Sequence, residues 1–317
     1  TRGPVQATLI IVSYNGRELL AKSLPAALAA ARRAGDHLVV LADDGSTDYS
    51  IHFAATTYPQ VRVLAFPHRG FGATCNAAVA HAETEAVVLL NSDALVSPDF
   101  LPPLLEDLSR PDVFLVGPKF LNADGSLTDT LGNRTSCRWH RGLLSIHHET
   151  DPDLLRETAP QLYANGAAMA FRRDKWLSLG GFDPLYRPFY WEDVDLGYRA
   201  WGRGWRVLHE PASEVVHEQG STVKRGHRAG YVELMSAKNA VLFTWKNFLD
   251  RGLLCRTLAA QVRWAADDVM IGGPLPRACA LLAAFRQLGE ATRARAGELR
   301  ERTRSDQEIM AASGAER

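Results

Sequence analysis

The chain has 317 residues, enough for one large domain or for a domain with an appended piece. Hydrophobic residues make up 46% and charged residues 23%, which is the composition of an ordinary globular enzyme. The 36 basic residues balance the 36 acidic ones, and this balance argues against a general nucleic-acid binder.

The first half of the chain alternates strand and helix signals. Apolar, β-branched runs predict strands at residues 8–14, 37–42, 61–66 and 86–91. Helical spacing predicts helices at residues 18–33, 47–58 and 71–84. Nearly continuous apolar strands separated by helices are typical of an α/β fold with a mainly parallel sheet covered on both faces. Ligands of such sheets bind beyond the carboxyl ends of the strands.

The second half is less regular. Residues 121–163 show no clear pattern, a strand is expected at 166–171 and a helix at 192–203, and two short strands are expected at 206–209 and 214–217. From about residue 226 the pattern becomes helical, over 231–249, 253–270 and 277–304, with a break at Gly272-Gly273-Pro274. We expect these helices to pack against or beside the preceding domain.

The helical segment also carries two features of surface chemistry. Leu253, Leu254, Leu258 and Val262 recur with helical spacing and are expected on one side. Residues 286–304 contain six Arg and three Glu. The segment could mediate a homodimer or approach a membrane, with the basic tail near anionic head groups. A tail that is simply a solvated helix end is an equally good interpretation.

Cysteine and apolar patterns bear on location. The four cysteines are scattered and form no CxxC pair, so we expect no zinc site and no redox motif, and reduced thiols in a cytoplasmic protein. The first apolar run is interpreted as a folded strand rather than a signal peptide. No run of about 18 or more apolar residues occurs, so no membrane-spanning helix is expected.

Acidic residues follow two of the predicted strands. Asp43 and Asp44 end the second strand, where a carboxylate can accept hydrogen bonds from a base or a ribose, although Asp, Gly and Ser also favour simple turns. Asn91-Ser92-Asp93 follows the fourth strand, where a carboxylate could hold a divalent cation on a diphosphate. A polar turn between strand and loop is the alternative interpretation.

A third acidic cluster opens a predicted helix. Trp191 is followed by Glu192, Asp193 and Asp195, three carboxylates in four positions, after the aromatic-rich segment 186–191. Acidic residues favour a helix N-terminus electrostatically, but three exceed what capping needs. Aromatic rings beside carboxylates suit sugar rings, so we favour a sugar-binding interpretation. His217, after the last short strand, carries little weight by itself.

Taken in order, these strings resemble the inverting glycosyltransferases of family 2, which have the GT-A, or nucleotide-diphospho-sugar transferase, fold. The match covers about residues 8–222, some two thirds of the chain. Its pieces are VSYNG (12–16), ADDGSTD (42–48), GFGATCNAA (70–78), LLNSDALVSPDFL (89–101), NGAAMAFRRDKWLSLGGFDP (165–184), FYWEDVDLGYRAWGRGWRV (189–207) and VVHEQGST (215–222). The Asn in the first acidic place and the DGSL turn extend the resemblance to a rhamnosyltransferase-like branch.

The resemblance implies a domain organisation. Residues 1–225 would form the GT-A domain, with a donor half over about 1–120 and an acceptor half over about 121–225. Residues 226–317 would form a helical C-terminal extension.

The resemblance also implies a role for each motif. The residues expected at the donor nucleotide are Ser13, Asp43, Asp44, Asn76, Asn91, Ser92 and Asp93. Asp93 matches the last acid of the family's DxD motif, which holds Mg or Mn, and His217 matches a residue that completes the metal site in some members. Asn91 replaces an acid of that motif, which removes one charge but leaves an amide oxygen able to coordinate.

Asp193 matches the general base of the family's ED-type motif, and Trp191, Glu192 and Asp195 are expected at the acceptor. The implied reaction is a single displacement that inverts the anomeric carbon. The base would take the acceptor hydroxyl's proton while the cation stabilises the departing diphosphate. The branch favours dTDP-rhamnose as the donor, with a UDP-hexose second. The acceptor would be a glycan, a glycolipid or a lipid-linked intermediate, at the inner face of the cell membrane.

Other enzyme classes fit less well. A dinucleotide-dependent oxidoreductase needs GxGxxG after the first strand, where Ser13-Tyr14-Asn15-Gly16 stands instead. A nucleotidyltransferase usually has a Gly-rich, basic loop there, which is also missing. A catalytically inactive nucleotide- or sugar-binding protein stays open as the alternative, although the presence of Asp93, Asp193 and His217 together argues against it.

Overall fold

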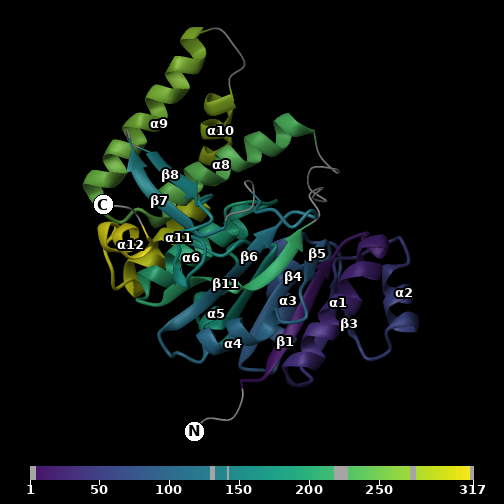
Figure 1. Ribbon diagram of the computed structural model, residues 1–317. Helices are drawn as coiled ribbons and strands as arrows, with labels where there is room; N and C mark the ends of the chain where they lie inside the picture. The colour runs from purple at the N-terminus through teal and green to yellow at the C-terminus, as the bar shows by residue number, and fades with distance from the viewer. Residues whose placement is uncertain (1–4, 129–132, 141–142, 218–227, 272–275, 315–317) are drawn as a thin grey trace.

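The computed structural model describes residues 5–128, 133–140, 143–217, 228–271 and 276–314. The expected break at 272–274 and the expected domain boundary at 225–226 lie outside these ranges. Figure 1 shows a central sheet flanked by helices, with the helices of residues 229–271 and 276–285 at the end of the molecule far from the N-terminus.

The central sheet has the order β3-β2-β1-β4-β10-β6-β11-β5, with β9 paired to β11. Its strands are β1 Ala7–Ser13, β2 Leu38–Asp43, β3 Arg62–Ala65, β4 Ala86–Asn91, β5 Ala94–Val96, β6 Val113–Leu121, β9 Ala159–Pro160, β10 Ala168–Arg172 and β11 Arg206–His217. The pairs β1–β2, β1–β4, β2–β3 and β6–β11 are parallel, whereas β10, β5 and β9 run antiparallel to their partners. The mainly parallel α/β sheet predicted from the apolar runs is therefore confirmed.

Helices cover both faces of the sheet because side chains of the central strands alternate between two apolar cores. Leu9 and Ile11 of β1 pack in a cluster with α1 Arg17–Gly35, α2 Ser50–Thr57 and α4 Leu101–Leu108. Ile10 and Val12 face the opposite cluster, which contains α3 Phe71–His81, α5 Arg173–Leu179 and α6 Glu192–Gly202. The same cluster also takes in helices from the C-terminal part of the chain.

Three sequence-based expectations need correction. The two short strands at 206–209 and 214–217 are one strand, β11, whose register to β6 shifts between Glu210 and Glu214 around Pro211. The segment without a clear pattern contains a hairpin, β7 Thr135–His140 with β8 Leu143–His148. The single helix expected over 277–304 is interrupted, giving α10 Pro276–Phe285 and α11 Leu288–Glu301, with α12 Asp306–Ala312 beyond.

The C-terminal helices pack onto the sheet domain. They begin with α8 Ala229–Asn247 and α9 Arg251–Ile271, and within the part of the chain that the structure describes no helix is both long and apolar enough to cross a membrane. Part of the basic tail is bound to the protein, since Arg302 donates to the Asn247 carbonyl and Glu298 pairs with Arg203 at 2.8 Å. The interpretation of this tail as a solvated end or a head-group contact is therefore wrong for Arg302, whose side chain is 4% exposed.

Candidate active site

The ends of β1, β2 and β4 form the first part of the site. Ser13 pairs with Asp43 in the β1–β2 register, and a Cβ built on Gly16 would lie 2.6 Å from the Ser13 hydroxyl and 3.2 Å from that of Ser92. VSYNG, ADDGSTD and NSD thus meet at one rim of the sheet, as expected from parallel strands that end together.

Asp43 keeps one carboxylate oxygen available at this rim. The residue is buried, and its Oδ2 accepts a hydrogen bond from the Ser46 amide at 2.8 Å. Its Oδ1 has no hydrogen-bond partner within the described part of the chain, and neither does the buried Ser13 hydroxyl oxygen. Buried polar atoms are normally satisfied, so these two atoms together are suited to a polar ligand.

Asp44 has a different role, because its carboxylate holds the loop before α3. It accepts hydrogen bonds from the amides of Arg69 at 2.9 Å and Gly70 at 3.1 Å, and from the Thr74 hydroxyl at 2.6 Å. The His68 ring nitrogen lies 2.9 Å from its second oxygen. These hydrogen bonds give Asp44 a structural role in holding this loop, and its expected contact with the donor remains a prediction.

Asn76 is also occupied by the protein itself. Its amide nitrogen donates to the Phe182 carbonyl at 2.8 Å, and its oxygen accepts from the Phe182 amide at 2.9 Å. This two-sided clamp ties α3 to the loop that precedes the acidic cluster. Asn76 thus positions that loop, and its expected contact with the nucleotide remains a prediction.

Asp93 and His217 come together at the same rim. Ala94 pairs with His217 in the antiparallel β5–β11 register, and His217 Nε2 lies 3.3 Å from Asp93 Oδ1. Both side chains are nearly buried, at 9% and 5% exposure. Two ligands on adjacent corners of an octahedral cation with bonds near 2.1 Å lie about 3 Å apart.

This spacing fits a shared divalent cation. No group of three or more His, Cys, Asp or Glu side chains suited to a metal occurs among the described residues. The remaining ligands of a cation bound by Asp93 and His217 would therefore come from water, from an amide oxygen such as that of Asn91, or from substrate phosphates.

Asp193 reaches the rim through the chain segment before β10. The Asn91 amide donates to the Ala167 carbonyl at 2.8 Å, and the neighbouring Gly166 amide donates to Asp193 Oδ2 at 3.1 Å. Asp193 Oδ1 accepts from the Val194 amide at 2.8 Å, which fixes the carboxylate at the start of α6. Two hydrogen bonds, made by the adjacent residues Gly166 and Ala167, therefore connect the predicted base to the end of β4, where the predicted metal motif lies. In the sequence, 100 positions separate Asp93 and Asp193.

Glu192 and Asp193 are half-buried neighbours. Burial raises the pKa of Asp193, although the backbone amides that it accepts from oppose this. Burial, with the adjacent Asp193 charge, raises the pKa of Glu192 to about 8. Glu192 Oε2 is buried without a hydrogen-bond partner among the described residues. The pair thus combines a carboxylate with raised proton affinity and an available polar atom beside it.

Asp195 does not take part in this surface. It is fully buried and accepts hydrogen bonds from four side chains, namely Tyr186 at 2.7 Å, Arg199 at 2.6 Å, Lys246 at 2.8 Å and Asn247 at 2.8 Å. Burial by itself would raise the pKa of Asp195, but Arg199 and Lys246 hold it well below its usual range. Asp195 thus ties α6 to α8, and its expected contact with the acceptor remains a prediction.

Residues of α8 support the aromatic segment before the acidic cluster, and sequence reasoning missed them. Asn239 Nδ2 lies 2.7–2.9 Å from the carbonyl oxygens of Tyr186, Phe189 and Tyr190. The Trp191 ring packs against Phe243 with centroids 5.2 Å apart. The polar residues within an otherwise apolar helix were the available signal. Their partners, about 50 residues away, could not be read from spacing.

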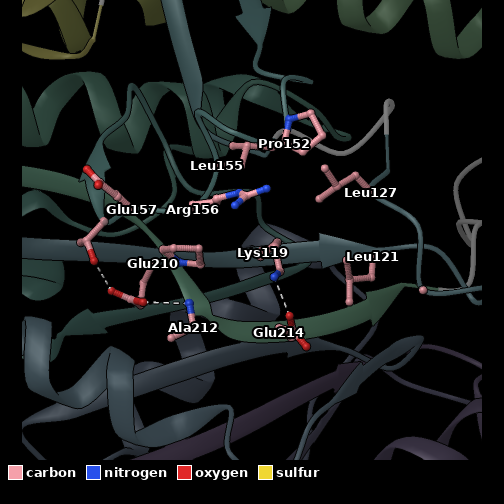
Figure 2. A pocket seen from close by; sticks show the side chains of 13 residues that line it. Lys119, Leu121, Leu127, Pro152, Leu155, Arg156, Glu157, Glu210, Ala212 and Glu214 are labelled. Carbon is pink, nitrogen blue, oxygen red and sulfur yellow. Dashed lines mark hydrogen bonds and ion pairs between the residues drawn. The ribbon is translucent and has the colours of Figure 1, made fainter.

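A separate open groove of about 800 Å³ lies beside β6 and the irregular part of β11 (Figure 2). Lys119 and Glu214 form an ion pair across it at 2.5 Å, and Thr158 donates to Glu210 at 2.5 Å. None of the predicted site residues lines this groove. The groove is therefore not assigned to the candidate site.

Comparison with known proteins decides the family. Residues 4–234 match the family model described as glycosyltransferase like family 2. The chain belongs to glycosyltransferase family 2. The matched region includes every predicted site residue, so this protein is a glycosyltransferase, and the family resemblance drawn from its motifs is confirmed.

Curated relatives refine the picture. The chain is 29% identical, over 59% of its length and 68% of the relative's, to the N-acetylglucosaminyl-diphospho-decaprenol L-rhamnosyltransferase of Mycobacterium tuberculosis. It is 27% identical to the O-antigen biosynthesis protein RfbC of Myxococcus xanthus, over 70% of this chain but 18% of that protein. It is 31% identical to a pre-mycofactocin glycosyltransferase of Mycobacterium tuberculosis, over 57% of this chain and 37% of the relative.

Solved structures show the same fold. GalNAc-T7, crystallised with UDP, GalNAc and Mn²⁺, superposes with a TM-score of 0.61 at 18% identity, covering 79% of this chain and 49% of that one. The mannosyltransferase PcManGT of Pyrobaculum calidifontis, in complex with GDP-Man and Mn²⁺, gives 0.55 at 21% identity, covering 98% of this chain and 86% of that one. The GT-A fold expected from the motifs is confirmed.

Proposed function

We propose that this glycosyltransferase moves a sugar from a nucleotide-diphosphate donor to an acceptor hydroxyl with inversion at the anomeric carbon, and that Asp193 is its catalytic base. The observation that carries the proposal is the link from the β4 rim to Asp193 through the Asn91–Ala167 and Gly166–Asp193 hydrogen bonds. This link brings a fixed carboxylate of raised pKa to the edge where Asp93 and His217 pair.

Asp43 and Ser13 are proposed to bind the donor nucleotide. The buried Asp43 Oδ1, which has no hydrogen-bond partner among the described residues, would accept from a ring N–H or a ribose hydroxyl, and the Ser13 hydroxyl would supply a second polar contact. Asn91, Ser92 and Asp93 are proposed to face the diphosphate. Asp93, with His217 as a second ligand, holds Mg or Mn there, and the cation when bound neutralises charge on the departing diphosphate.

Asp193 is proposed to take the proton of the acceptor hydroxyl. An alcohol is a poor nucleophile until it loses that proton, which a carboxylate within hydrogen-bond reach removes as the new bond forms. Attack from the face opposite the leaving group inverts the centre in one step, so no covalent intermediate on the protein is needed. Trp191 and Glu192, which adjoin the base, are proposed to contact the acceptor.

The donor is proposed to be a pyrimidine nucleotide sugar, dTDP-rhamnose first and a UDP-hexose second. The NSD and DGSL strings support this choice, as does the likeness to a rhamnosyltransferase named for a diphospho-decaprenol acceptor. By the same likeness the acceptor is proposed to be a lipid-linked glycan, reached from the cytoplasmic side of the cell membrane.

The test is a screen of nucleotide sugars for release of the nucleoside diphosphate, with and without Mn and with a short lipid-linked disaccharide precursor as acceptor. Turnover with dTDP-rhamnose that requires the acceptor and an inverted product linkage support the proposal. Binding of nucleotide without turnover under all these conditions would favour an inactive nucleotide-binding protein instead. Transfer from purine nucleotide sugars alone would exclude the proposed donor class.

A further inference from the structure

Exposed apolar side chains concentrate on the C-terminal helices. Twelve large apolar residues are exposed in the described part of the chain, and six of them lie between residues 258 and 288. They are Leu258 (37%), Val262 (61%) and Trp264 (38%) of α9, Leu282 (65%) and Phe285 (51%) of α10, and Leu288 (44%) at the start of α11. Such clustering distinguishes an interaction surface from apolar residues scattered singly.

Helix α9 turns an apolar stripe outward. Cys255, Leu258, Ala259, Val262 and Ala266 recur at helical spacing, and all five are exposed.

The opposite side of α9 is buried although it is polar. Thr257 is fully buried and accepts a hydrogen bond from the Trp139 indole at 3.3 Å. Gln261, 6% exposed, accepts one from the Trp245 indole at 3.0 Å. The helix thus contacts the protein through Thr257 and Gln261 together with Leu253 and Leu254, and it presents a second set of apolar side chains to the outside.

Helix α10 packs between α8 and α9 and continues this surface. Leu282 and Phe285 are exposed on it, while Ala280 and Ala284 are buried. The three helices form the end of the molecule far from the N-terminus (Figure 1). We call Leu258 and Val262 of α9, Leu282 and Phe285 of α10, and Leu288 the helical face.

The charge around the helical face selects its partner. Residues 251–293 contain six Arg and three acidic residues, a net charge of +3, while the whole chain is neutral. Arg256, Arg263 and Arg286 are exposed beside the apolar residues. Two copies of this chain would bring like charges together, whereas an anionic bilayer offers opposite charge at its surface and an apolar layer beneath it.

We propose that the helical face docks this enzyme on an anionic lipid bilayer, lying in the head-group region without spanning it. Helix α8, against which α10 packs, joins the face to the acceptor side of the site. The Tyr231 ring of α8 meets Phe189 with centroids 6.3 Å apart, and Lys238 donates to the Arg187 carbonyl at 2.7 Å. Docking would therefore hold the aromatic segment near the head groups, which matters for catalysis if the acceptor is lipid-linked as proposed above.

The test is sedimentation of the full chain with vesicles of phosphatidylcholine containing about one third phosphatidylglycerol, compared with phosphatidylcholine alone. The wild type should pellet with the anionic vesicles and lose binding in high salt. The double variant Val262→Asp with Leu282→Asp should lower the bound fraction by about tenfold or more, because it places two charges in the face. The matched control is Leu177→Asp, which adds a charge at an apolar residue of α5 that is 44% exposed, and it should bind as the wild type does.

Failure of the wild type to bind anionic vesicles would overturn the proposal, as would equal binding by the double variant. A wild-type dimer that the double variant converts to a monomer, without vesicle binding, would show that the face is a contact between copies and would also overturn it. Sedimentation needs no turnover, so its outcome is separate from that of the proposed reaction. Release of nucleoside diphosphate with a water-soluble acceptor should be unchanged in the double variant.

Discussion

Two isosteric substitutions in α6 should have different effects. Asp195→Asn should lower the stability of the protein, and Asp193→Asn should lower sugar transfer; the first gives the sharper test. Asp195 is completely buried between Arg199 and Lys246, whose side chains are 3% and 2% exposed. Asn keeps the shape but removes the charge, which leaves two buried cations with one less anion and turns an amide N–H toward donors.

The magnitude follows from the burial of all three groups. Breaking a buried ion pair by removing one partner costs about 3–5 kcal/mol. At about 2 °C per kcal/mol, the low end of the range for larger chains, the midpoint of thermal unfolding should fall by about 6–10 °C. Differential scanning fluorimetry measures this directly, with Asp193→Asn as the matched control. That control should change the melting temperature little and lower transfer by about 10²-fold or more, with nucleotide affinity retained.

The same network predicts a direction for pH. The pKa of Asp195 is lower in the folded protein than in the unfolded chain, where it is about 3.9. Its contribution to stability is therefore fully present above that unfolded value and is lost as the pH falls toward the folded one. The gap in stability between wild type and Asp195→Asn should thus be constant near neutrality and shrink below about pH 4. A variant that melts with the wild type yet fails to transfer sugar would refute this reasoning and return Asp195 to the acceptor site.

Three further results are expected. Asp93→Ala should abolish most metal-stimulated turnover and His217→Ala should weaken it less, and full wild-type turnover in excess chelator would show that the pair does not hold a required cation. Asp43→Ala should weaken nucleotide binding measured by calorimetry with little loss of stability. Asp44→Ala should destabilise the protein by about 1–3 kcal/mol, because it leaves the buried Thr74 hydroxyl and two backbone amides without their acceptor. Equal effects of the two substitutions on nucleotide affinity would contradict this division. Since burial raises the pKa of Asp193, turnover should fall as the pH drops through a value above the usual Asp range, and an acid limb of kcat/KM at or below about pH 3.9 would contradict that cause.

Much of the fold could be predicted because its signals are local. The apolar runs at 8–14 and 86–91 became β1 and β4, and the helix expected after Trp191 begins at Glu192. The continuity of β11 could not be predicted from the sequence, because Pro211 interrupts its strand pattern. In the structure β11 pairs with β6 on both sides of Pro211 and so forms one strand. The hairpin β7–β8 was missed because its partner surface is supplied by α9, more than 100 residues later in the chain.

The sequence by itself determined the family, the order of the motifs and the rim of the sheet at which they meet, because strand periodicity and strand ends are properties of short segments. The tertiary structure decided which acids are tied to other parts of the chain. Asp44 and Asp195 look as suitable as Asp43 and Asp193 in the sequence, but their side chains accept hydrogen bonds from donors up to 52 residues away. Hydrogen-bond partners at that separation are set by packing, so the sequence alone could not show them.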